Sequence, residues 1–223
     1  MTAATPAART RQGTMERITT LRAIAVVRLD DAEAAVRAAE AVHAGGVHAI
    51  EVTLTTPGAE DVIRRLSERE GMVVGAGSVL DADAARRAID AGARYLVSPV
   101  FLPQLVHVAH AAEVAVMLGA FTPTEILAAH RAGADAVKVF PSDALGPAFI
   151  KGVLGPMPFL RLVPTGGVTP ENAGDWLRAG AVAVGLGGSL VDPKRVAAGD
   201  FDLLTERARQ VVASVAAARG GAA

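Results

Sequence analysis

Eight short apolar runs recur along the chain, separated by amphipathic, alanine-rich segments. Short apolar runs bounded by turn residues indicate buried strands, and the segments between them, such as residues 31–46, carry apolar residues at helical spacing. The pattern therefore predicts eight consecutive strand–helix units. The runs begin every 20 to 26 residues, at Ala23, Ala49, Val73, Tyr95, Ala115, Ala136, Leu162 and Ala183.

Residues that start and stop helices support this division. Asp31, Asp81 and Thr122 precede helical segments as N-cap residues, and Gly45 and Gly92 follow such segments as terminators. Eight such units in this length predict an α/β protein with a single-domain (β/α)8 TIM barrel, for which ~200 residues is the lower end of the size range. A doubly wound open sheet is the structural alternative.

The barrel domain is expected to span residues 21–219. The segment before it lacks an apolar run like the core of a signal peptide, so we expect residues 1–20 to form a disordered or loosely helical N-terminal tail. Residues 220–223 are expected to form a short C-terminal tail.

The amino-acid composition argues against some classes of binding partner. The chain is 51% hydrophobic and 20% charged, which suits one globular domain with a full core. A formal net charge of -1 and 4% aromatic residues disfavour nucleic acid and an anionic membrane surface as partners. Residues 95–112 carry no formal charge, but Ser98, Pro99 and Pro103 interrupt them, so no membrane span is expected. The absence of cysteine fits a cytoplasmic protein.

The sequence predicts neither a metal site nor a bound cofactor. His107, His110 and Glu113 are spaced three apart, but no HExxH or Cys/His pattern accompanies them, so a solvated helix face is expected. The GAGS segment at residues 75–78 lacks the final glycine and the later acidic residue of a dinucleotide fingerprint.

Strand alternation places one carboxylate and one ammonium inside the expected barrel. In the second apolar run the alternate apolar residues face the helices, so Glu51 points inward. In the sixth run the same reasoning points Lys138 and Phe140 inward. Burying an unpaired charge is costly, so this placement requires a partner or a purpose.

Lysine is rare in this chain, since only Lys138, Lys151 and Lys194 are lysines among the 22 basic residues. Of these, Lys138 falls inside an apolar strand pattern. Burial favours the neutral amine, which can attack a carbonyl carbon and form an imine, whereas a guanidinium cannot. Two interpretations stay open: a catalytic lysine, or a structural Lys138–Glu51 ion pair that fills the barrel.

Two glycine-rich turns end the seventh and eighth strands, where barrels commonly bind phosphate. They are PTGGV at residues 164–168 and GLGGSL at residues 185–190. Small residues let backbone N–H groups approach an oxyanion, although glycine pairs also end strands for packing reasons. We predict a phosphate site formed by Gly166, Gly167, Gly187, Gly188 and Ser189.

Several segments, in chain order, resemble the 2-keto-3-deoxy-6-phosphogluconate (KDPG) and 4-hydroxy-2-oxoglutarate (KHG) aldolase family over residues 23–214. The resemblance implies a metal-independent, class I cleavage of KDPG to pyruvate and glyceraldehyde 3-phosphate in the Entner–Doudoroff pathway. By resemblance, Lys138 is the Schiff-base lysine and Glu51 the general acid and base. The segments are IEVTLTTPGA, GAGSVL, VSP, VKVFPSDALGPAFIKGVLGP, PTGGVTPEN and GLGGSLV.

The resemblance also implies a set of substrate-binding residues and a homotrimer. Some family members have an arginine at the position of Thr55, and that arginine binds the substrate carboxylate. We therefore assign the carboxylate to Arg28, which matches an arginine of other members, together with Ser78. The implied substrate-binding set is Arg28, Thr55, Ser78, Pro99, Phe140 and Thr165.

Three further questions stay open at this level. Thr165 resembles gluconate-type members, but cleavage of the 2-keto-3-deoxy-6-phosphogalactonate epimer is the alternative. Whether KHG is also cleaved is the second open question. A phosphate-binding barrel isomerase or synthase that uses Glu51 as its base, with Lys138 as an electrostatic partner, is the alternative of another class.

Overall fold

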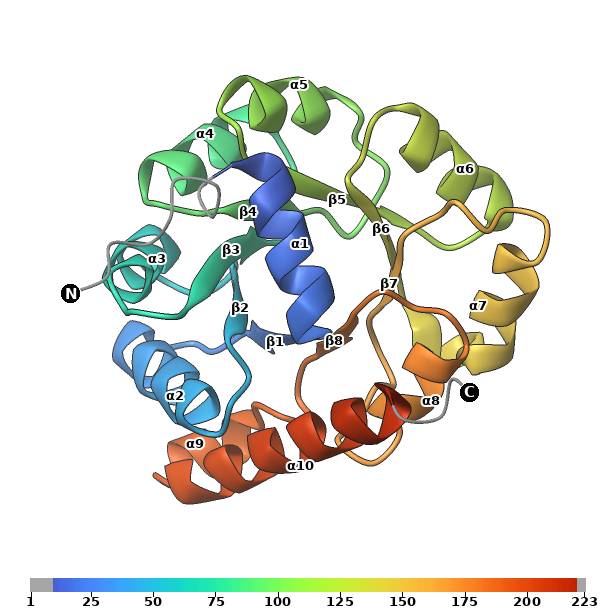
Figure 1. Cartoon of the computed structure of the whole chain (residues 1–223). Helices are drawn as coiled ribbons and strands as arrows, with labels where there is room; N and C mark the ends of the chain where they lie inside the picture. The colour runs from blue at the N-terminus through green and yellow to red at the C-terminus, as the bar shows by residue number, and fades with distance from the viewer. Residues whose placement is uncertain (1–9, 220–223) are drawn as a thin grey trace.

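Eight parallel strands form a barrel in the computed structural model of this chain, which describes residues 10–219. The strand order is β7-β6-β5-β4-β3-β2-β1-β8 (Figure 1). A bridge between Thr165 and Gly185 joins the end of β7 to β8. The predicted (β/α)8 barrel is confirmed. The strands are β1 (Ala23–Val27), β2 (Ala49–Thr53), β3 (Val73–Gly77), β4 (Tyr95–Val97), β5 (Ala115–Ala120), β6 (Ala136–Val139), β7 (Leu162–Pro164) and β8 (Val184–Leu186).

Helices surround the barrel and begin at the predicted caps. Asp31, Asp81 and Thr122 each accept a hydrogen bond from a backbone N–H in the first turn of the helix that follows. A short 3-10 turn, η2 (Ser142–Ala144), follows β6. The outer helices are α2 (Ala32–Ala44), α3 (Ala59–Ser67), α4 (Ala82–Asp90), α5 (Gln104–Ala111), α6 (Pro123–Arg131), α7 (Gly146–Leu154), α8 (Ala173–Arg178), α9 (Pro193–Ala197) and α10 (Phe201–Arg219).

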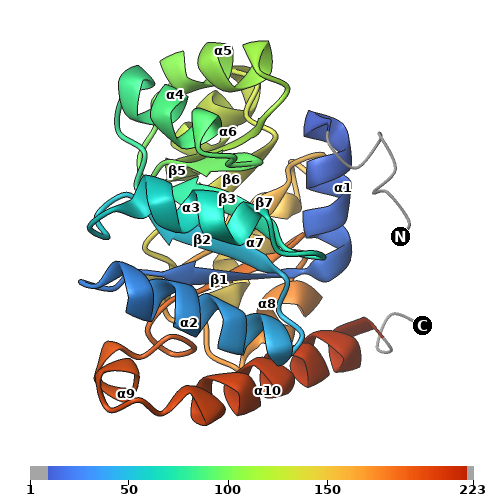
Figure 2. The same cartoon turned by 90° about the vertical axis from the view of Figure 1, so that its left-hand side faces the viewer.

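One further helix, α1 (Arg11–Leu21), lies across one end of the barrel (Figures 1 and 2). Met15 and Ile18 are buried there against inward-facing strand residues such as Ile24 and Met117. The expected disordered or loosely helical tail is therefore corrected for residues 11–20, because burial of this small apolar face stabilises a regular helix. The part of the expected tail at residues 1–9, like the expected C-terminal tail at residues 220–223, lies outside the described residues.

Strand alternation separates an outer core from the barrel interior. Ile50 and Val52 of β2, like Val137 and Val139 of β6, are buried in the layer between strands and helices. Lys138 therefore faces the interior, as predicted. At the amino end of the strands, the interior is filled by apolar side chains and closed by α1, so the functional site is confined to the opposite end.

None of the helices within residues 10–219 combines the length and the apolar character that crossing a bilayer requires.

Candidate active site

Lys138 and Glu51 meet inside the barrel. They come from β6 and β2, which are four strands apart in the sheet, yet Lys138 Nζ lies 3.4 Å from Glu51 Oε1. The two side chains are 7% and 3% exposed. The Lys138 Nζ also lies 5.3 Å from the centre of the Phe140 ring. The amine is thus held in a buried site with one carboxylate and one aromatic face beside it.

Two glycines of β3 leave room for this arrangement. A Cβ atom at Gly77 would overlap Oε1 of Glu51, and a Cβ atom at Gly75 would overlap the ring of Tyr95. The strand register places Glu51 and Tyr95 on either side of Gly75. The missing side chains on β3 therefore determine where the Glu51 carboxylate lies.

Tyr95 is fully buried below this pair, and its hydroxyl has no hydrogen-bond partner among the described residues. Burial raises the pKa of Tyr95 well above its ordinary value, and the negative charge of Glu51 raises it further. The phenol therefore stays protonated and neutral next to Glu51.

A cavity of about 370 Å³ leads from Lys138 to the carboxyl ends of β7 and β8. It brings together most of the residues that the sequence singled out. Its lining also includes Val26, which the sequence pattern did not single out. Val26 stands two residues before Arg28, so strand alternation would have placed both on the same face. The lining residues are Val26, Arg28, Lys138, Phe140, Thr165, Gly166, Gly167, Val168, Thr169, Gly187, Gly188, Ser189, Val191 and Pro193.

Three predicted substrate-binding residues do not line this cavity. Ser78 contacts a lining residue, because its Oγ accepts a hydrogen bond of 3.4 Å from Arg28 Nη2. Thr55 is exposed, with its hydroxyl 3.0 Å from that of Thr53. Pro99 is half-buried, and its carbonyl group packs against Gly119. The structure thus brings Arg28 and Ser78 together and leaves Thr55 and Pro99 outside the cavity lining.

Each carbonyl group of the β7 turn accepts a hydrogen bond from a side chain or a backbone N–H. Those of Thr165 and Gly166 accept hydrogen bonds of 3.0 and 2.9 Å from Ser142, and those of Gly167 and Val168 accept bonds of 2.9 and 2.7 Å from Asn172 and Ser189. In a trans peptide, the following N–H points the opposite way. The N–H groups of Gly166 and Gly167 therefore point away from Ser142, which is not in the cavity lining.

The same holds for the β8 turn. The Gly187 carbonyl accepts bonds of 2.9 Å from Leu190 N and Val191 N, which directs the Gly188 N–H away from them. Within the described chain, the N–H groups of Gly166, Gly167, Gly187 and Gly188 donate no hydrogen bond. Several free N–H groups around one cavity form an anion-binding arrangement. The Ser189 hydroxyl, a predicted phosphate ligand, lines the same cavity and donates to the Val168 carbonyl.

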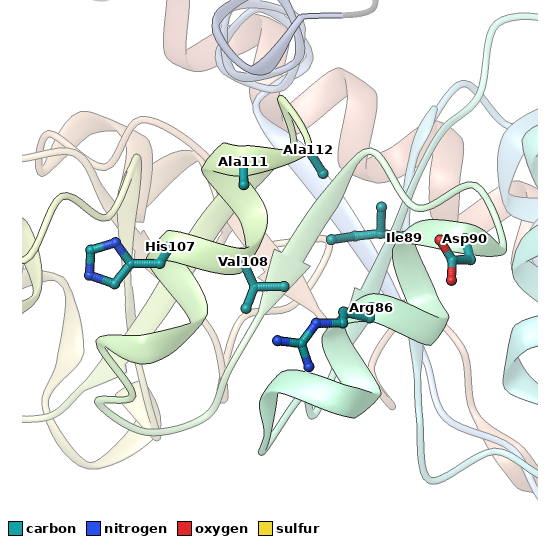
Figure 3. Close-up of a pocket in the computed structure, with 7 residues that line it drawn as sticks. All are labelled: Arg86, Ile89, Asp90, His107, Val108, Ala111 and Ala112. Carbon is teal, nitrogen blue, oxygen red and sulfur yellow. The ribbon is translucent and has the colours of Figure 1, made fainter.

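A second, larger cavity of about 470 Å³ lies on the outside of the barrel, between α4 and α5 (Figure 3). Arg86 on its edge is paired with Asp83 at 2.7 Å, and the lining includes His107 and Asp90. It contains neither Lys138 nor a glycine turn, so its size alone does not make it the active site. Residues 10–219 contain no group of three His, Cys, Asp or Glu side chains that could hold a metal ion.

The comparisons with known proteins agree with this geometry. The family model "KDPG and KHG aldolase" matches residues 14–207. A 2-dehydro-3-deoxy-phosphogluconate aldolase from Pseudomonas aeruginosa is 38% identical, over 78% of this chain and 80% of the relative. A KHG/KDPG aldolase from Escherichia coli strain K12 is 35% identical, over 87% of this chain and 92% of the relative.

A solved structure is also similar throughout. It is a KDPG aldolase from Legionella pneumophila with pyruvate captured as a covalent carbinolamine intermediate. The TM-score is 0.81 at 28% identity, covering 89% of this chain and 97% of the other. The chain therefore belongs to the KDPG and KHG aldolase family.

Proposed function

We propose that this protein is a class I aldolase that cleaves KDPG to pyruvate and glyceraldehyde 3-phosphate, the lyase step of the Entner–Doudoroff pathway. The observation that carries the proposal is the buried Lys138–Glu51 pair, in which Lys138 lines one cavity together with two glycine turns and Glu51 lies behind it, outside the cavity lining. Family membership supports the same chemistry.

Lys138 supplies the electron sink. Its neutral amine attacks the C2 ketone to give a carbinolamine, which loses water to form an iminium ion. The C3–C4 bond then breaks: its electron pair moves into the iminium and gives an enamine, while the C4 hydroxyl loses its proton and becomes the aldehyde of glyceraldehyde 3-phosphate. Protonation of the enamine at C3 and hydrolysis of the imine release pyruvate and restore the amine. The iminium makes a metal ion unnecessary for this step.

Glu51 transfers the protons that these steps require. Its position 3.4 Å from Lys138 Nζ supports proton exchange at the carbinolamine. A water molecule can extend its reach to the C4 hydroxyl. The contact of Glu51 with Gly77 supports this role, since it limits where the carboxylate can move.

The substrate's two anionic ends bind different groups in this proposal. Arg28 and Ser78 bind the carboxylate next to C2, and Phe140 covers the pyruvyl part. The phosphate lies against the N–H groups of Gly166, Gly167, Gly187 and Gly188, with Ser189 and Thr165 beside them. Contacts from Thr55 and Pro99 stay predictions of the family resemblance.

Reductive trapping tests the reaction class. Borohydride with pyruvate should add a reduced pyruvyl group to a peptide containing Lys138, which mass spectrometry detects. An isomerase or synthase that used Glu51 only as a base would give no adduct. Assays of the gluco and galacto epimers and of KHG, side by side, separate the gluconate preference proposed here from the galactonate alternative and measure KHG cleavage.

We further propose a cytoplasmic homotrimer. Exposed apolar side chains gather on loops at the carboxyl ends of β3, β4 and β5, namely Leu80, Val100, Phe101 and Phe121. An apolar surface of this kind favours contact between copies of a chain. Light scattering after size-exclusion chromatography should give three times the mass of one chain, and Val100→Glu should lower it. A phosphorylated substrate, which does not cross a bilayer unaided, supports the cytoplasmic location.

A further inference from the structure

Ser142 makes two hydrogen bonds to the β7 turn without reaching the cavity. It begins η2, separated from the end of β6 by Phe140 and Pro141, and is fully buried. Its backbone N–H donates to the Thr165 carbonyl at 3.0 Å, and its hydroxyl donates to the Gly166 carbonyl at 2.9 Å. The residue is absent from the cavity lining. One buried serine on the β6 loop thus holds two successive peptide groups of the neighbouring turn.

These bonds determine the direction of the N–H groups. When Ser142 holds the Gly166 carbonyl, the N–H of Gly167 in the same peptide group must point the opposite way. Gly166 and Gly167 have φ angles of 97° and 71°. Glycine has more freedom in φ and ψ than other residues, so a contact from outside the turn is required to fix the peptide plane.

We propose that Ser142 is a positioning residue, whose hydroxyl prepares the β7 turn to bind the phosphate group of the substrate. It orients the Gly166–Gly167 peptide so that the Gly167 N–H meets a phosphate oxygen. This proposal rests on the proposed function, which assigns the phosphate to the two glycine turns. The bond from the Ser142 N–H to the Thr165 carbonyl does not involve the side chain, so the hydroxyl can be tested separately.

The test is Ser142→Ala, with Ser214→Ala as the matched control. The Ser214 hydroxyl also bonds to a backbone group, accepting from Gly174 N at 3.0 Å, but it lies on α10, outside the cavity lining. In Ser142→Ala, we expect the KM for KDPG and the inhibition constant of inorganic phosphate to rise about three- to tenfold, as for one lost neutral hydrogen bond. The kcat, KHG cleavage and borohydride trapping of pyruvate should stay unchanged, and Ser214→Ala should change none of these constants.

The outcomes separate this proposal from the proposed function. If wild-type protein forms no pyruvate adduct or is not inhibited by phosphate, the proposed function fails and this proposal fails with it. If wild-type protein behaves as expected but Ser142→Ala leaves both phosphate-dependent constants unchanged, only the role of Ser142 is overturned. Equal losses on KDPG and KHG also overturn it, since they indicate a general structural role. Should Ser142→Ala fold poorly, Ser142→Cys, with a similar size and a weaker donor, must show the same selective rise.

Discussion

The Nζ atom of Lys138 lies 3.4 Å from Oε1 of Glu51, although their strands β6 and β2 stand four positions apart in the sheet. Gly77 of β3 leaves the space that the Glu51 carboxylate occupies in this contact. A buried pair of this kind is weak evidence for stability, since the cost of desolvating both charges offsets their attraction. The opening of Lys138 onto a cavity with free N–H groups favours a chemical role instead.

Replacing Lys138 by arginine keeps the positive charge and removes the chemistry. Because a guanidinium does not form an imine, Lys138→Arg should lose KDPG cleavage by several orders of magnitude. Release of pyruvate, followed with lactate dehydrogenase, measures the rate, and circular dichroism checks the fold. Near-normal turnover in this variant would refute the Schiff-base mechanism.

Gly77→Ala tests the position of Glu51 without removing its carboxylate. The new Cβ atom would overlap Oε1 of Glu51, so the carboxylate must leave its present position. We expect kcat to fall towards the ~10²- to 10⁴-fold loss typical of a missing general acid or base. Gly152→Ala on α7 is the control, because a Cβ atom there meets nothing within 4 Å. Unchanged kcat in Gly77→Ala would show that Glu51 tolerates displacement.

Sequence pattern was sufficient to predict the barrel because its strands are short, apolar and regularly spaced. The strands β2 and β6 begin at Ala49 and Ala136, as predicted, and β8 begins at Val184, one residue later than predicted. The alternation of side chains correctly predicted that Lys138 faces the barrel interior. Successive side chains of a strand point to opposite faces even where both faces are buried. The glycine turns were found because they follow strands directly.

Other features depend on contacts that sequence spacing does not reveal. Sequence pattern left the segment of α1 as either disordered or loosely helical, because its apolar face is small. Met15 and Ile18 are its deeply buried apolar residues, and the open barrel end gives that face a partner. The Ser142 hydroxyl bonds to a carbonyl 24 residues away, and no local motif indicates this contact. The family pattern likewise did not indicate that Thr55 lies outside the cavity lining.

Removal of divalent ions should leave activity intact. The iminium ion supplies the electron sink, and the described residues contain no cluster of metal-ligand side chains. Dialysis against EDTA should therefore change KDPG cleavage by less than twofold. Loss of activity that a divalent ion restores would move the protein to the metal-dependent class of aldolases.

Acid should destabilise the protein through the His43–His48 pair. Their Nδ1 atoms lie 2.9 Å apart. Burial lowers the pKa of both imidazoles, and the charges of His43 and Arg17 lower the pKa of His48 further. The unfolded chain, with ordinary values near ~6.5, then binds more protons than the folded one. Stability should therefore be constant above that pH and fall as the pH drops below it.

Urea unfolding between pH 7.5 and pH 5.0 measures this loss. His48→Gln should reduce the slope of stability against pH, because it removes one titrating ring and the repulsion between the two. His107→Gln, at an exposed position on α5, is the matched control and should leave the slope unchanged. An identical slope in His48→Gln and wild-type protein would assign the acid sensitivity to other groups.

Gly187→Ala separates a phosphate site from a tight turn. A Cβ atom at Gly187 meets nothing within 4 Å, so the folded protein accepts it, but the residue lines the cavity and the methyl group would take space from a phosphate. Loss of one bond to a charged group is worth ~1.5–3 kcal/mol, so kcat/KM for KDPG should fall roughly ten- to a hundredfold. Pyruvate trapping should be spared, because pyruvate has no phosphate. If trapping and thermal stability fall together instead, the turn is structural and the phosphate binds elsewhere.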